Sequence, residues 1–265
     1  MERLLVLRLD AAGCAAEARV NGVPMLRTGV TGGRAAVAVH EYTRGGANRL
    51  SLVVEPGMGA GTGASEPRVA GAGQRARLDL ALARRGQAPT DPNARVLASK
   101  AWTPAEGDAF EAPLELTHDV ELPVSFPRWR WLDAPVVPEH PATERLALEL
   151  VQHLAADFAR GDPERYLAAA RLRFEELAAA YQGSAAELVQ RFRDRLQALY
   201  AAKALVVAPV VAATFRLRRI ADGRLVECVD AMGEPALRTV AGPDGSASAW
   251  PLRLAVVENR IYVLR

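Results

Sequence analysis

The chain has 265 residues, of which half are hydrophobic and 24% are charged. That composition is typical of a globular protein, and the length suffices for one large domain or two smaller ones with their own cores. Because 33 basic side chains balance 31 acidic ones and leave a net charge of only +2, the overall charge argues against nucleic acid and anionic membranes as partners. No apolar stretch approaches the roughly 20 residues that span a bilayer.

The choice of basic residues indicates the source of the protein, and its first residues bear on its cellular compartment. Only two of the basic residues are lysines, Lys100 and Lys203, and alanine is abundant, which indicates a GC-rich bacterial genome. The apolar run at residues 4–7 is interrupted by Arg8 and Asp10 and is shorter than a signal-peptide core. We therefore expect a cytoplasmic protein, with an exported chain whose signal peptide has been removed as the alternative.

Cysteine and histidine spacing predicts no metal and no cofactor. Cys14 and Cys228 lie far apart, no Cys-x-x-Cys motif occurs, and the four histidines have no HExxH or other close spacing of the kind that zinc sites use. We expect two reduced, buried cysteines, with a single long-range disulfide as the alternative in an exported protein.

Residues 1–135 show short apolar runs separated by turn signals, with almost no helical periodicity. This pattern is typical of β-sandwiches and barrels. Asn21-Gly22 is a hairpin signal, because both residues adopt positive φ at low cost. We predict an antiparallel β-sandwich domain at residues 1–135, with strands at residues 5–9, 18–20, 23–26, 35–40, 49–54, 76–83, 95–102 and 112–122.

Two segments of this half, Val20-Asn21-Gly22-Val23-Pro24 and the pattern Gly46-x-Asn48-x-Leu50, resemble the galactose-binding-like jelly rolls attached to many glycoside hydrolases. The resemblance spans residues 20–52. It implies a jelly roll more strongly than it implies sugar binding, since many such domains only pack against neighbouring domains.

A glycine-rich stretch lies in the middle of this half. Gly59–Ala64 fits a loose G-x-G-x-x-A pattern, but a dinucleotide-binding loop must open a helix whose N-terminus receives the pyrophosphate. Here a proline and further glycines follow, so we expect a surface loop.

The tryptophans are the binding candidates of the first half. Trp129-Arg130-Trp131 stands just before a proline-rich linker at residues 136–141, and Trp102 is placed in the same class. Indole rings beside an arginine can stack on a sugar or dock on a protein. The simpler interpretation is that they form a plug that is buried against the next domain.

Residues 141–202 predict three helices in a row. Gly161-Asp162-Pro163 ends the first and starts the second, since glycine tolerates the left-handed conformation, aspartate caps free amides and proline fits the first helical turn. Ser184 with Glu187 forms a capping box for the third. Strands are predicted afterwards at residues 206–220, 225–230, 236–240, 249–257 and 260–264, with turns at residues 242–245 and 258–259. Helices followed by an antiparallel meander predict an α+β domain at residues 142–265.

The Phe158–Leu167 helix junction and the last strand, Asn259–Leu264, are similar to two motifs of the nuclear-transport-factor-2-like (NTF2-like, or SnoaL-like) superfamily. The resemblance covers the C-terminal half and implies a cone of helices on a curved sheet. The superfamily includes isomerases, dehydratases, binding modules and assembly domains, so the fold alone implies no reaction.

Catalytic members of that superfamily place acid/base residues in the pocket. The candidates here are His153, Asp157, Tyr166 and Asp230, with Glu227 on the strand of Asp230. His153 and Asp157 are four residues apart, on one side of a helix, and could relay a proton inside an enclosed cavity. A surface histidine with a nearby aspartate is the simpler interpretation. An enclosed pocket lined by at least two of the four candidates would favour an enzyme.

We therefore predict a two-domain protein without catalytic motifs. We expect it to recognise another protein, as an accessory, adaptor or immunity-type partner, and its self-association into a homo-oligomer stays open. Small-molecule binding or acid/base catalysis in the second domain, and carbohydrate binding by the first, are the alternatives.

Overall fold

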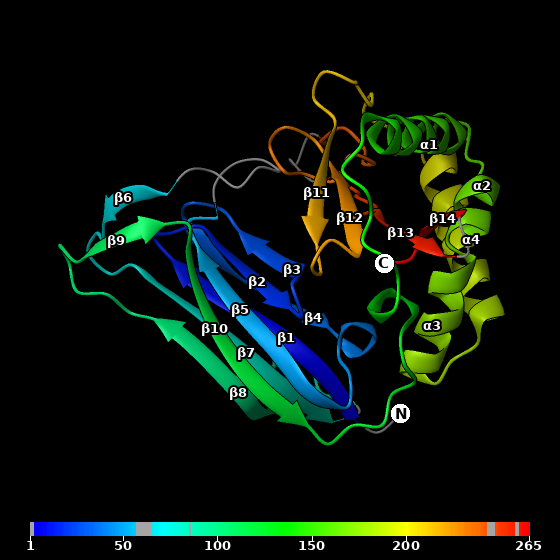
Figure 1. Ribbon diagram of the computed structural model, residues 1–265. Coiled ribbons are helices and arrows are strands. Elements are labelled where there is room, and N and C mark those ends of the chain that lie inside the picture. Colours follow the sequence, from blue (N-terminus) through cyan, green and yellow to red (C-terminus); the bar gives the residue numbers. More distant parts are fainter. Residues whose placement is uncertain (1–2, 57–64, 85, 243–246, 258–259) are drawn as a thin grey trace. The chain divides into compact units, whose positions relative to one another are not determined.

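A computed structural model describes residues 3–56, 65–84, 86–242, 247–257 and 260–265 (Figure 1). The fold is mixed α and β, with antiparallel sheets and four α-helices in the described part of the chain, which confirms the predicted class. Contacts divide the chain into two compact units, which meet in sequence between Arg128 and Trp129. The predicted loop at residues 59–64 and the turn at residues 258–259 lie outside the described residues, as do residues 243–245 of the other predicted turn.

The first unit is built from strands. Its strands are β1 (Arg3–Ala12), β2 (Ala16–Val20), β3 (Val23–Thr28), β4 (Gly32–Ala38), β5 (Gly46–Val54), β6 (Glu66–Val69), β7 (Arg75–Arg84), β8 (Arg95–Trp102), β9 (Ala109–Ala112) and β10 (Leu114–Leu122). They form two four-stranded sheets, ordered β4-β1-β7-β8 and β10-β5-β2-β3, which lie as two layers in Figure 1, and the small ribbon β6-β9. The ribbon was not predicted, because Glu66-Pro67-Arg68-Val69 has neither apolar alternation nor a strand-like composition.

The strand β1 is buried on both of its faces. Leu5, Leu7 and Leu9 are at most 2% exposed on one side, and Val6 packs on the other side with a small alanine cluster that includes Ala94. Ala94 belongs to the connection between β7 and β8. Arg8 fastens this connection, since its Nε donates to the Pro89 carbonyl at 2.7 Å and its Nη2 to the Asp91 carbonyl at 2.6 Å.

The two asparagines that carry the jelly-roll resemblance bind each other. Asn21 has a φ of 50° in the β2–β3 turn, and its Nδ2 donates to Asn48 Oδ1 at 2.9 Å and to the Tyr42 carbonyl at 2.8 Å. In return its Oδ1 accepts from the Arg49 amide at 2.9 Å. The motif therefore fastens a hairpin turn to the beginning of β5, which is a structural role.

The second unit combines four helices with one sheet. Its elements are α1 (Pro141–Ala159), α2 (Glu164–Ala169), α3 (Arg171–Tyr181), α4 (Ala185–Ala201), β11 (Arg216–Ile220), β12 (Leu225–Val229), β13 (Arg253–Val257) and β14 (Arg260–Val263). The sheet is antiparallel in the order β11-β12-β13-β14. Helix residues Val151, Leu154 and Phe158 share one core with Cys228 and Leu254 of the sheet. No helix in the described part of the chain is long and apolar enough to cross a bilayer.

The predicted helix boundaries follow from capping chemistry. His140 Nδ1 accepts from the Ala142 amide at 3.1 Å and caps α1. Gly161 has a φ of 74° after α1, and Asp162 Oδ1 accepts from the Glu164 amide at 2.9 Å before α2. Ser184 Oγ accepts from the Glu187 amide at 3.4 Å and caps α4.

The predicted second helix is in fact two helices. The backbone bends at Ala170, with φ −97° and ψ 10°, although neither proline nor glycine occurs there. Tyr166 before the bend and Phe174 after it both contact the ring of Phe192, at centroid distances of 4.6 and 6.0 Å. Packing between distant parts of the chain accompanies the bend, and no local signal marks it.

Of the predicted strands, the one at residues 236–240 is wrong, and the one at residues 206–220 is confirmed only at Arg216–Ile220, which form β11. Residues 206–215 form no strand, and only the isolated bridge Val207–Thr239 links them to residues 236–240, which are irregular as well. Pro209 lacks an amide hydrogen, and the Val211 carbonyl accepts from the Thr214 and Phe215 amides, which turns the chain. The strand predicted at residues 249–257 begins only at Arg253.

Candidate functional site

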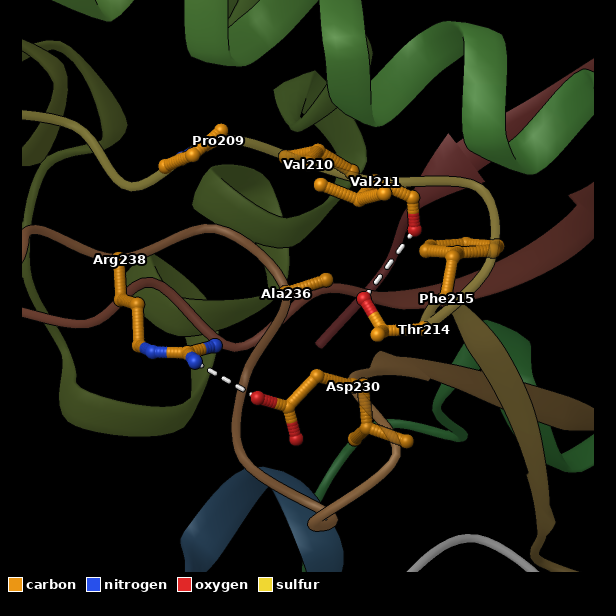
Figure 2. Close-up of a pocket in the computed structure, with 9 residues that line it drawn as sticks. Pro209, Val210, Val211, Thr214, Phe215, Asp230, Ala236 and Arg238 are labelled. Carbon is orange, nitrogen blue, oxygen red and sulfur yellow. Dashed lines mark hydrogen bonds and ion pairs between the residues drawn. The ribbon is translucent and has the colours of Figure 1, made fainter.

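The two irregular segments of the second unit line a surface depression (Figure 2). It encloses about 290 Å³, open solvent included. Six of its nine lining residues are apolar, but the surface that it exposes is more polar than apolar, and Asp230 and Arg238 provide the charged part. The lining residues are Pro209, Val210, Val211, Thr214, Phe215, Val229, Asp230, Ala236 and Arg238.

The charged part of the depression is internally paired. Asp230 Oδ2 lies 2.6 Å from Arg238 Nη2 (Figure 2). Asp230 Oδ1 accepts from the backbone amides of Met232 at 2.8 Å and Glu234 at 3.0 Å. Both oxygens of this carboxylate are thus occupied by donors from the protein itself. The arrangement orders the turn after β12 rather than offering a general base.

Exposed apolar side chains occur on the same two segments and on the turn after β12. Of the ten large hydrophobic residues that are exposed in the described part of the chain, four belong to residues 206–240. We call Val206, Val211, Met232 and Val240, which are 55%, 49%, 54% and 45% exposed, the apolar quartet. The Val240 amide donates to the Val206 carbonyl at 2.9 Å, and Met232 follows two residues after Asp230. Exposed apolar groups that are concentrated in this way are typical of interaction surfaces.

The structure does not bring the four catalytic candidates together in one pocket. His153 is exposed on α1, while Asp157 is buried and paired with Arg160 and Arg165 Nε, the latter at 2.6 Å. Of the four, the depression contains Asp230. Asp157 therefore joins the end of α1 to α2, and the His153–Asp157 relay is not observed.

Tyr166 lies inside an aromatic core. It is 2% exposed, and its ring stacks on Phe192 at 4.6 Å with an interplanar angle of 10°. Phe158 and Phe174 also contact this ring. The hydroxyl accepts a hydrogen bond from Arg173 Nη1 at 2.8 Å. Tyr166 therefore lies among packed aromatic rings and not in an open acid/base pocket.

The tryptophan candidates are buried. Trp129 and Trp131 are 1% and 3% exposed, and both belong to the second unit by contacts. Trp102, at the end of β8, is also buried and packs edge-on against Phe110 at 5.1 Å. None of the three presents an open indole face for stacking on a sugar.

Arg130 and Glu176 connect the tryptophan motif to α3. The Arg130 amide donates to Glu176 Oε1 at 2.7 Å, and its guanidinium lies 2.9 Å from Glu175. Glu176 also pairs with the buried Arg265, whose guanidinium lies 5.8 Å from the centre of the Trp129 ring. Sequence reasoning missed this cluster, because its members are separated by up to 136 positions and no local pattern links them.

A second buried charge cluster spans three strands of the sheet. Glu227 on β12 lies opposite Arg218 on β11 and Arg253 on β13 in the strand register. It pairs with both arginines, at 2.9 Å between Arg253 Nε and Glu227 Oε1. Burial raises the pKa of Glu227, but the two guanidinium groups outweigh that effect and hold the pKa below its usual value. The carboxylate is thus kept ionised and engaged.

The described residues also include no cluster of metal ligands and no reactive thiol. In the described ranges, no group of three or more His, Cys, Asp and Glu side chains has the geometry to hold a metal ion. Cys14 and Cys228 are both free thiols and buried. Burial raises the pKa of each, most strongly that of Cys228, so both stay protonated and unreactive near neutral pH.

In the comparisons with known proteins, no family model, no curated protein and no solved structure matches this chain.

Proposed function

We propose that this protein recognises another protein and acts as an accessory, adaptor or immunity-type partner. The observation that carries the proposal is the apolar quartet, four exposed apolar side chains within residues 206–240, of which Val211 lines the depression. Such exposure costs solubility unless the surface is used. The charges of the small depression are already paired with each other, so it offers no free acid or base to a reacting small molecule.

The proposed occupant is an extended segment of the partner protein that carries an apolar residue. The backbone amides of Val210 and Val211 have no hydrogen-bond partner in the described part of the chain. A backbone amide without an internal partner can pair with the backbone of an added segment, while the depression receives one of the segment's side chains. The recognition would then combine backbone pairing with burial of Val211 and Met232.

The alternatives lack such support. Acid/base catalysis would need His153, Asp157 or Tyr166 beside Asp230, and carbohydrate binding would need an open face on Trp102, Trp129 or Trp131. We keep both as outcomes of the test. We also propose that the partner is neither nucleic acid nor a membrane, and that the protein is bacterial and cytoplasmic.

The finer fold assignments belong to the same proposal. The two facing sheets with the Asn21–Asn48 link support a jelly-roll-like β-sandwich, and the helices on one antiparallel sheet support an NTF2-like domain. Both folds serve widely as binding modules. If the two units fold as independent domains, the proposed recognition surface belongs to the second domain.

The experiment is selection of peptides from a random phage-displayed library on the purified protein. We expect enriched peptides with alternating apolar residues, and titration calorimetry of a synthetic winner should show micromolar binding. Val211→Asp and Met232→Asp each place a charge on the surface and should weaken binding about tenfold or more.

Val30→Asp is the matched control, because Val30 is 73% exposed on the first unit. Binding that survives Val211→Asp and Met232→Asp, or peptides that no longer bind Val30→Asp, would contradict the proposed site. Circular dichroism and a melting curve establish that each variant is folded. A dimer that dissociates in Val211→Asp, seen by light scattering, would make a second copy of the chain the occupant and would contradict the foreign partner.

A further inference from the structure

Three arginines lie side by side at one end of the sheet β4-β1-β7-β8. Arg3 of β1 pairs directly with Arg84 of β7 in the strand register. Arg95 of β8 pairs with Leu82 and is therefore the diagonal neighbour of Arg84. Directly opposite residues point to the same face of a sheet, so the three side chains share one face on three adjacent strands.

All three side chains are exposed, and none forms an ion pair with a carboxylate in the described part of the chain. Four buried carboxylates of the protein each engage two arginines, whereas these three arginines face each other. Like charges directly opposite each other destabilise a sheet. An uncompensated cationic row is therefore a local cost to stability, and such costs are often retained for binding.

We propose that Arg3, Arg84 and Arg95 form a docking surface for an acidic segment of a partner protein. Adjacent strands are spaced about 4.8 Å apart, so the row spans roughly 10 Å. Alternate carboxylates of an extended peptide are about 7 Å apart and can meet two or three guanidinium groups in forked hydrogen bonds. Because the row is short and the whole chain has a net charge of only +2, an acidic peptide fits it better than a nucleic acid does.

This surface is independent of the depression, since it lies on the first unit and the depression lies on the second. The test therefore separates the two proposals. Its first measurement needs no ligand: Arg84→Glu replaces a repulsive pair with an attractive one, and the melting temperature should rise. Unchanged or lower stability would overturn the argument from repulsion.

The second measurement is fluorescence anisotropy of a labelled octaglutamate peptide with the full-length protein. We expect binding that weakens steeply between 50 and 300 mM salt, as about three released counterions require. Arg84→Glu and Arg95→Glu should each weaken binding about tenfold. Arg145→Glu is the matched control, because Arg145 is exposed on α1 and its reversal changes the net charge equally.

Three outcomes would overturn the proposal: no binding at millimolar peptide, equal weakening by Arg145→Glu, or tighter binding of a single-stranded oligonucleotide than of the peptide. Equal weakening would mean that only net charge matters. Preference for the oligonucleotide would assign the row to nucleic acid.

Discussion

The excess of arginine over lysine indicates a GC-rich genome, but several of the arginines also have a specific structural role in this protein. Four buried carboxylates are each held by two arginines: Glu17 by Arg19 and Arg27, Asp157 by Arg160 and Arg165, Glu176 by Arg130 and Arg265, and Glu227 by Arg218 and Arg253. The guanidinium fork matches carboxylate geometry and retains its charge when buried. The buried carboxylates that a reader of the sequence would examine for catalysis, Asp157 and Glu227, are thus held as structural anions.

The cluster at Glu227 makes a prediction about stability. Glu227→Gln removes the anion between Arg218 and Arg253 and leaves two largely buried cations together. We expect a loss of about 3 kcal/mol in the free energy of unfolding, measured by urea denaturation, because breaking a buried ion pair exposes the full desolvation cost of the remaining charges. Glu106→Gln, at an exposed position, should change it by less than about 0.5 kcal/mol. A Glu227→Gln protein as stable as this control would contradict the structural role.

The same carboxylate predicts an acid dependence of stability. Its pKa is lower in the folded protein than the ordinary value of 4.5, so its contribution is fully present above the pKa of the unfolded chain. The contribution is lost as the pH falls from that value through the folded pKa. Between pH 5 and 3, the free energy of unfolding should therefore fall less steeply in Glu227→Gln than in the natural chain. Parallel curves would show that Glu227 is not the group that titrates.

The two cysteines make a chemical prediction. Both are buried, and burial raises the pKa of both thiols. In the native protein at pH 8 we expect neither to react with Ellman's reagent within minutes, while both react in guanidinium chloride, because the thiolate is the reactive form. Rapid native reaction of one thiol, or fewer than two thiols after unfolding without reductant, would contradict the structure.

Among the elements, turn chemistry was more predictive than β propensity. The structure confirms the turn predicted at Asn21-Gly22 and the helix ends predicted at Gly161-Asp162 and Ser184. Each of these features satisfies a backbone requirement within a few residues. The valine-rich residues 206–215 were predicted to form part of a strand, but Pro209 and the turn at Val211 make this segment irregular. A β-branched residue fits a strand only when a neighbouring strand is available, and that is decided by the rest of the chain.

The link between Asn21 and Asn48 makes a prediction at this scale. Asn48→Ala removes its hydrogen bond with Asn21 and those to the Arg44 and Gly46 carbonyls, and we expect a loss of about 1–3 kcal/mol in the free energy of unfolding. In the double variant Asn21→Ala/Asn48→Ala, the loss should be smaller than the sum of the two single losses, since both remove the same bond. Strict additivity in urea denaturation would mean that the two turns are not coupled. Asn93→Ala, at an exposed loop position, serves as the control.

At the scale of the molecule, contacts divide the chain between Arg128 and Trp129, whereas the sequence predicted a sandwich to residue 135, a linker at 136–141 and a second domain from 142. Trp129, Trp131 and Val137 are buried, and Val137 belongs to the core of the second unit. The proline-rich composition of residues 134–141 resembles a linker, but Ala134 and Val137 within it are buried.

The domain boundary can be tested by expression of fragments. We predict that residues 129–265 fold cooperatively by themselves, while residues 142–265 lose several kcal/mol or fail to fold, because the shorter fragment lacks the buried Trp129, Trp131 and Val137. Thermal unfolding followed by circular dichroism compares the two. Equal stability of both fragments would restore the boundary at residue 142, and failure of both would mean that the units do not fold independently.

The sequence by itself determined the α+β class, most strand positions of the first half, and the ends of the helices around residues 161 and 184. These features depend on turn chemistry, capping and periodicity, which act between residues that are close in the chain. Only the tertiary structure decided that the helix bends at Ala170, that Asp157 and Tyr166 are structural, that Val206 and Val211 stay exposed, and that Glu176 pairs with Arg265. Each of these depends on side chains brought together from distant positions, where packing and charge pairing outweigh local preference.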